Sequence, residues 1–172
     1  MTRFFDRVYD AAAGLAAAFM VGTLVFVVLG ILGRLIGFHL RGTDAYAGYC
    51  MAGCGFLALA HTLRRGEHIR VTLVLDYVGP RLRRALEIAC LAAGVALSGL
   101  LAWYSVRLAW QSHTFNDIST ANDATPLWIP QLAMAAGSLL LAVAFVEWLV
   151  NALRGAPPAA PAAPASGPAH VE

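Results

Sequence analysis

The chain has 172 residues, of which 59% are hydrophobic and only 13% are charged, and its formal net charge is +2. So little charge excludes an ordinary soluble domain of this size, and a net charge this small gives no reason to expect a nucleic-acid partner. The apolar residues fall in blocks of about 20, the length at which a helix crosses a bilayer core. The composition therefore predicts an all-α integral membrane protein.

Four apolar blocks predict four transmembrane helices. The first follows a short lead-in with aromatic residues and arginines, and it has no charge until Arg34. Trp and Tyr residues near the ends of the later blocks suit the two membrane interfaces. The four predicted spans are residues 11–33, 45–62, 88–106 and 126–150, which together form a membrane domain over residues 1–154.

The second block is rich in small residues, among them Gly48, Ala52 and Gly55. Small side chains let helices approach closely in lipid, where burial away from water no longer drives association. We therefore expect this helix to pack against protein, and these three residues to lie at a helix–helix contact.

The polar interval 64–84 separates the second block from the third and holds six of the twelve basic residues, all arginines. Within it, four apolar residues recur at helical spacing between positions 71 and 78. This spacing predicts a short amphipathic helix over about 69–78 that lies on the membrane surface. Gly79-Pro80 should break it, and the next helix should begin near Arg81.

Two further polar segments complete the pattern. Residues 111–125 are rich in Ser, Thr, Asn and Asp, which favour turns, so they predict a loop between the third and fourth spans. Residues 155–172 are rich in Ala and Pro and have too few large apolar residues to form a core. They predict a disordered tail.

The arginines predict the orientation, since the chain has no Lys. With four spans, both termini and the interval 64–84 share one side of the membrane. That side holds nine arginines, against three on the other. By the positive-inside rule, both termini face the cytoplasm and the loop 111–125 faces outward.

The predicted spans contain few groups for chemistry. Carriers usually keep charged groups at membrane depth, whereas Glu87, Arg107 and Glu147 lie near span ends. Membrane haem needs two His on different helices at similar depth, and only His61 falls within a predicted span. The chain is therefore not expected to be an enzyme. We expect no catalytic, substrate-binding or metal-binding residues and no cofactor.

The run LRRGEHIRVTLVLDYVGPRLRRALE, residues 63–87, resembles the segment after the second span in DctQ-like small subunits of TRAP (tripartite ATP-independent periplasmic) transporters. The shared pattern is Arg-Gly-x-His-Ile-Arg-Val, an apolar stretch with Asp, and then Pro-x-x-x-Arg. Upstream, Arg34 and Gly42-Thr43-Asp44 also match, although members often have Trp and a second acidic residue there. The resemblance implies that these residues contact the partner subunit or lipid headgroups: Arg34, Asp44, Arg64, Arg65, Gly66, Glu67, His68, Arg70, Asp76, Pro80, Arg81 and Arg84.

The resemblance, which covers about residues 5–153, also implies partners. Such a subunit supports a large DctM-like membrane subunit that carries the substrate and sodium sites. A DctP-like periplasmic binding protein docks on the complex and delivers an organic acid or a similar solute. We therefore expect ion-driven symport, with sodium as the ion, at a bacterial inner membrane and in contact with its lipids. A function from another class stays open, namely a four-span anchor of a haem- or quinone-linked redox enzyme.

Overall fold

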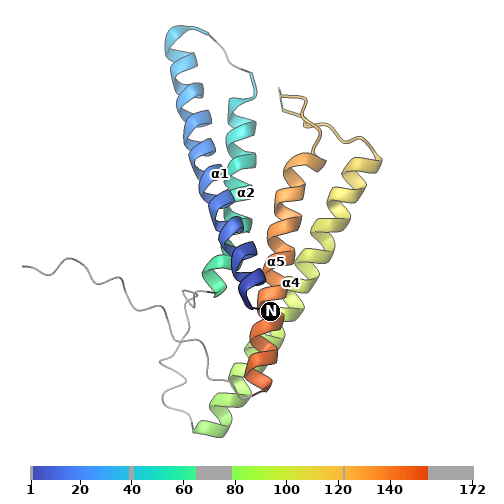
Figure 1. Cartoon of the computed structure of the whole chain (residues 1–172). Coiled ribbons are helices and arrows are strands. Elements are labelled where there is room, and N and C mark those ends of the chain that lie inside the picture. The colour runs from blue at the N-terminus through green and yellow to red at the C-terminus, as the bar shows by residue number, and fades with distance from the viewer. Residues whose placement is uncertain (1, 39–40, 65–78, 122, 155–172) are drawn as a thin grey trace, which may run out of the picture.

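The computed structural model describes residues 2–38, 41–64, 79–121 and 123–154. Most of them belong to α-helices, and α1 packs antiparallel to α2, α4 antiparallel to α5, and α2 against α5 (Figure 1). In the view of Figure 1, the two pairs converge toward the end of the molecule at which α1 begins and α5 ends, and they diverge toward the opposite end. The helices are α1 (Thr2–Ile36), α2 (Thr43–Arg64), α4 (Pro80–Thr114) and α5 (Trp128–Leu153).

Three of these helices are long and apolar enough to cross a membrane. They are Arg7–Ile36 within α1, Arg81–Thr114 within α4 and Trp128–Leu153 within α5. The helical membrane class predicted from the sequence is supported. The helix α2 is not among the three, because its glycines and the polar residues at its ends lower its hydropathy, so the predicted count of four spans is not confirmed.

Two helices extend beyond the spans predicted for them. At 35 residues each, α1 and α4 are about 50 Å long, whereas a bilayer core is about 30 Å thick. Hydropathy marks only the part of a helix that suits lipid, so it does not show where the helix ends. Pro80 occupies the first turn of α4 after Gly79, as predicted. The predicted surface helix at 69–78 and the predicted tail at 155–172 lie outside the described residues.

The helices α1, α2 and α5 meet at the convergent end around Tyr9. This ring is only 1% exposed and packs in one cluster with Ala60, Leu63, Leu141 and Ala144. Its hydroxyl donates to the Leu140 carbonyl at 3.5 Å. A tyrosine can be buried at such a junction because its polar tip finds a partner there.

A stripe of small residues on α4 faces α5. Its buried members follow one another at alternating intervals of four and three residues, so they stay on one face when two helices wind around each other. The buried Ser98 Oγ donates to the Gly94 carbonyl of its own helix at 2.6 Å. The members of the stripe are Ser98, Ala102, Ser105, Ala109 and Ser112.

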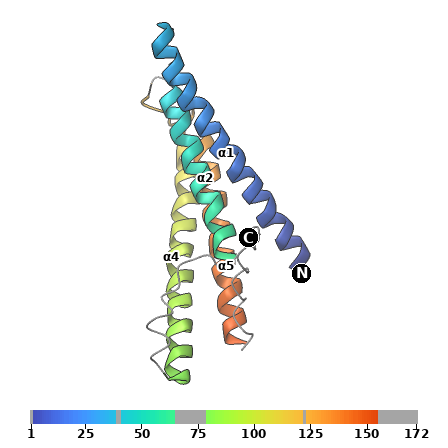
Figure 2. The ribbon, with the colours of Figure 1, turned by 90° about the vertical axis from the view of Figure 1, so that its left-hand side faces the viewer.

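Much of the outer surface is apolar, and α1 and α4 lie at opposite edges of the molecule (Figures 1 and 2). Only 11% of the most apolar window of each is buried inside the chain, against 28% for α5. Leu24 and Leu97, for example, are 63% and 69% exposed. Exposure of so many large apolar side chains to water would be unfavourable, so lipid or another protein covers these helices.

Candidate interaction surface

The structure places the two ends of the predicted motif. Arg64 is the last residue of α2, and Pro80, Arg81 and Arg84 lie in the first turns of α4, at the convergent end. Arg81 and Arg84 are exposed. The part of the motif between these helices lies outside the described residues, and it comprises Arg65, Gly66, Glu67, His68, Arg70 and Asp76.

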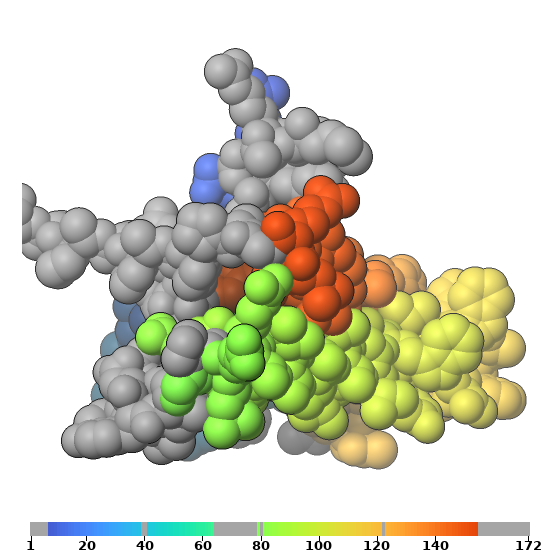
Figure 3. Space-filling model, turned by 90° about the horizontal axis from the view of Figure 1, so that it is seen from below, coloured from blue at the N-terminus to red at the C-terminus, as the bar shows by residue number. Residues whose placement is uncertain are grey.

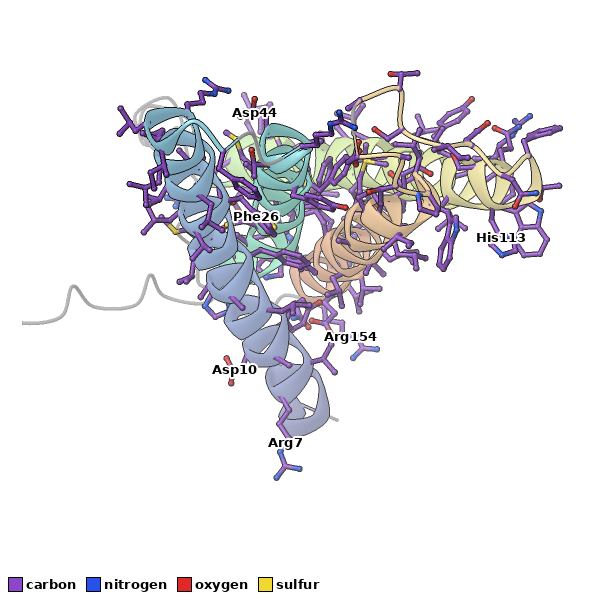
Figure 4. The ribbon with its side chains drawn as sticks, turned by 90° about the horizontal axis from the view of Figure 1, so that it is seen from above. Arg7, Asp10, Phe26, Asp44, His113 and Arg154 are labelled. Carbon is purple, nitrogen blue, oxygen red and sulfur yellow. The ribbon has the colours of Figure 1, made fainter. Side chains whose placement is uncertain are left out.

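At the divergent end, Arg34 and Asp44 form an ion pair. The Arg34 Nη2 donates to Asp44 Oδ2 at 2.9 Å, which connects the last turn of α1 to the first turn of α2. Figure 4 labels Asp44 at the beginning of α2. Both side chains are exposed, at 63% and 81%, so the pair contributes about 0–1 kcal/mol. The resemblance singled out both residues separately, and the structure brings them together.

A second contact at this end joins α2 to the loop between α4 and α5. Tyr49 Oη lies 2.9 Å from Ser119 Oγ and 3.1 Å from Asp123 Oδ2. Thr125 Oγ1 donates to Tyr46 Oη at 3.1 Å. We call these five residues the α2–loop cluster.

Tyr49 has one phenolic proton for its two oxygen partners. An ionised carboxylate only accepts, so the single phenolic proton of Tyr49 goes to Asp123. Ser119 Oγ lies 2.9 Å from Tyr49 Oη and accepts from the Ala121 N–H at 3.2 Å.

The aspartate of the cluster is held in its charged form. Burial by itself would raise the pKa of Asp123, but the surrounding hydroxyl groups of Thr125, Ser119 and Tyr49 outweigh it and hold this pKa below its ordinary value. The second carboxylate oxygen, Oδ1, is buried and has no hydrogen-bond partner among the described residues.

The loop has a defined backbone of its own. The Ser119 N–H donates to the Thr125 carbonyl at 2.9 Å, and the Leu127 N–H donates to the Asp117 carbonyl at 3.0 Å. Ala124 has a positive φ of 48°, which closes the turn between these bonds. The loop can therefore present Ser119 and Thr125 to α2 in fixed positions.

An aromatic contact extends the cluster to α1. The Tyr46 ring stacks on Phe26 of α1 with centroids 5.4 Å apart, and it meets Tyr49 edge to face at 6.1 Å. Sequence reasoning did not find this cluster. The one available signal was the spacing of Tyr46 and Tyr49 by three residues, which puts both phenols on one side of a helix.

The small residues singled out on α2 face outward from this chain. Gly48, Ala52 and Gly55 are exposed, and a Cβ added at Gly48 or Gly55 would meet no atom within 4 Å. By contrast, Gly53 on another side of α2 is buried against the Phe19 ring. The three exposed positions recur at helical spacing, so they form one narrow face, which we call the α2 small-residue face.

Within the described residues, no group of three His, Cys, Asp or Glu side chains could hold a metal ion. Cys50, Cys54 and Cys90 are free thiols. The ring of His113, at the end of α4, meets the Trp128 ring edge to face, with the two centroids 5.4 Å apart.

These observations define a helical membrane protein that exposes a small-residue face and encloses no metal site in its described part. The family model of the DctQ component of tripartite ATP-independent periplasmic transporters matches residues 23–155. The chain belongs to this family and is therefore a component of a transporter, as the motif predicted. None of the curated proteins compared with the chain matches it. The alternative function as a redox anchor gains no support.

Proposed function

We propose that the chain is the small membrane subunit of a TRAP-type secondary transporter. It supports a large membrane subunit in the uptake of an organic acid or a similar solute, which a periplasmic binding protein delivers and a sodium gradient drives. The family match over residues 23–155 carries this proposal.

The α2 small-residue face is the proposed docking site for helices of the large subunit. Gly48, Ala52 and Gly55 are exposed and leave room for a second helix to approach the α2 backbone. Among the described residues, α1 and α5 pack against α2, and these three positions stay exposed. The motif residues between α2 and α4 are proposed to contact the same partner or lipid headgroups.

Substitution on this face tests the docking site. Ala52→Leu and Gly55→Leu should leave the chain folded, because both positions are exposed, but should prevent close approach of the partner. Co-purification of the tagged large subunit should fall at least about tenfold, which corresponds to about 1.4 kcal/mol. Gly14→Leu is the matched control, since Gly14 is exposed on α1 with open space around it. Undiminished co-purification with both α2 variants would refute the docking site.

We further propose that α2 also crosses the membrane, so that four spans place both termini in the cytoplasm of a bacterial inner membrane. The beginnings of α1 and α4 and the ends of α2 and α5 lie at one end of the molecule (Figure 1), which supports this layout. In a cysteine-free variant, Thr120→Cys should react with a membrane-impermeant thiol reagent added to intact spheroplasts, and Ala169→Cys should not. The reverse pattern would overturn the orientation.

A further inference from the structure

The helix α4 has a second face that the proposed assembly does not use. The residues that face α5 form the stripe that includes Ala102, Ser105 and Ala109, and all three are buried. Arg107 lies about 180° around the helix from the centre of this stripe, at about 100° per residue. It is exposed. Arg107 therefore lies on the side of α4 opposite the stripe that faces α5.

Aromatic residues surround this arginine. Trp103 is 68% exposed, Tyr104 is 60% exposed and Trp110 is 75% exposed. They precede or follow Arg107 by three or four residues, so all of them lie within one turn of it on the same side of α4. The C-terminal half of α4, yellow in Figure 3, forms a projecting edge of the molecule.

The position of Arg107 on the helix restricts what can neutralise its charge. It lies seven residues before Thr114, the last residue of α4, hence about 10 Å from the helix end. Arg107 makes no ion pair or hydrogen bond with any described residue. A charged side chain at this depth extends toward the headgroup layer, and Trp and Tyr prefer the same layer.

The kinds of side chain on the two exposed faces distinguish their partners. Close packing of membrane helices needs small residues, as on the α2 small-residue face, and not the large rings that flank Arg107. A guanidinium instead offers paired N–H donors that match the oxygens of a phosphate. We propose that Arg107, flanked by Trp103, Tyr104 and Trp110, binds the phosphate of a phospholipid headgroup in the leaflet at the C-terminal end of α4.

Native mass spectrometry of the purified full-length chain can test this binding without the large subunit. The chain is titrated with phosphatidylglycerol and, separately, with diacylglycerol, which has the same acyl chains but no phosphate. Arg107→Gln should reduce the bound phosphatidylglycerol about fivefold, while Arg107→Lys should retain more of it. Arg41→Gln is the control, because Arg41 is exposed at the same end of the molecule and has a single flanking aromatic residue, Phe38, in place of two Trp and one Tyr. Equal binding by wild type and Arg107→Gln, or equal binding of diacylglycerol and phosphatidylglycerol, would overturn the proposal.

A crosslinking experiment in the assembled complex separates lipid from protein as the occupant. A photoreactive benzoylphenylalanine placed at position 104 should capture radiolabelled phospholipid. Capture of the large subunit at this position would overturn the lipid assignment and would leave the proposed assembly standing. Conversely, if the chain fails to assemble with any large subunit but still binds phosphatidylglycerol through Arg107, only the proposed function fails.

Discussion

Two features of the structure require a glycine at position 42: its backbone conformation and the close approach of a neighbouring residue. Its φ of +84° lies in the region that residues with a Cβ rarely adopt. A Cβ built there would also lie 2.7 Å from the Cβ of Asp123, a member of the α2–loop cluster. Gly42 therefore permits both the turn into α2 and the approach of the loop from the other helix pair.

Comparison of two glycines separates these effects. Gly37 has a similar φ of +76° but open space around it. Gly37→Ala should cost about 1 kcal/mol of unfolding free energy through strain alone, whereas Gly42→Ala should cost about 1–3 kcal/mol because the loop must also move. Thermal unfolding in detergent, followed by tryptophan fluorescence, measures both variants. Equal losses would show that the contact with Asp123 is unimportant.

The lowered pKa of Asp123 predicts a pH dependence. A carboxyl group whose pKa is lower in the folded state stabilises that state above its unfolded pKa, for which the ordinary value is 3.8. This stability is lost as the pH falls through the lower, folded value, so the contact between loop and α2 should weaken below about pH 4. Unfolding measured from pH 7 to pH 3 should show this loss in the wild type and a smaller loss in Asp123→Asn. Parallel curves for the two proteins would contradict the assignment.

At the scale of helices, Gly137 sets the distance between α2 and α5. A Cβ at this position would lie 2.5 Å from the backbone carbonyl of Phe56 on α2. The backbone of a helix cannot yield as a flexible side chain can. The contact between α2 and α5 joins the two helix pairs, so this glycine determines how the whole chain packs.

Gly137→Ala should therefore push α2 and α5 apart and destabilise the fold by about 1–3 kcal/mol. Gly99 on α4 is the control, because a Cβ there meets nothing within 4 Å. Gly99→Ala should be neutral or stabilising by up to about 1 kcal/mol through helix propensity. A cysteine crosslink between α2 and α5 should form more slowly in Gly137→Ala alone. If both variants behaved alike, α2 and α5 would not be in close backbone contact.

The sequence predicted the helices better than it predicted their contacts. Hydropathy located α1, α4 and α5, and the Gly79-Pro80 pair marked the start of α4. Hydropathy could not show that α1 starts at Thr2, because Arg3, Asp6, Arg7 and Asp10 interrupt the apolar residues of the lead-in. The α2–loop cluster joins residues 70 or more positions apart, and polar side chains in a loop follow no period that reveals such a partner.

At the scale of the whole molecule, two helix pairs are joined along α2 and α5 and closed at the divergent end by the α2–loop cluster. Outside these contacts the surface is divided by residue size. The α2 face has small residues and suits a helix, whereas the Arg107 edge of α4 has large rings and suits lipid headgroups. The proposed support of a larger membrane subunit would use both kinds of surface.

The central claim is that this chain is required for uptake but does not itself bind the transported solute. The direct test is uptake into liposomes that contain the large subunit and this chain, alone or together, with the binding protein and its identified ligand supplied outside. We predict sodium-dependent uptake only when both membrane subunits are present, with loss of at least about tenfold in liposomes that contain Ala52→Leu. Sodium-dependent uptake by this chain alone, or undiminished uptake without it, would contradict the account.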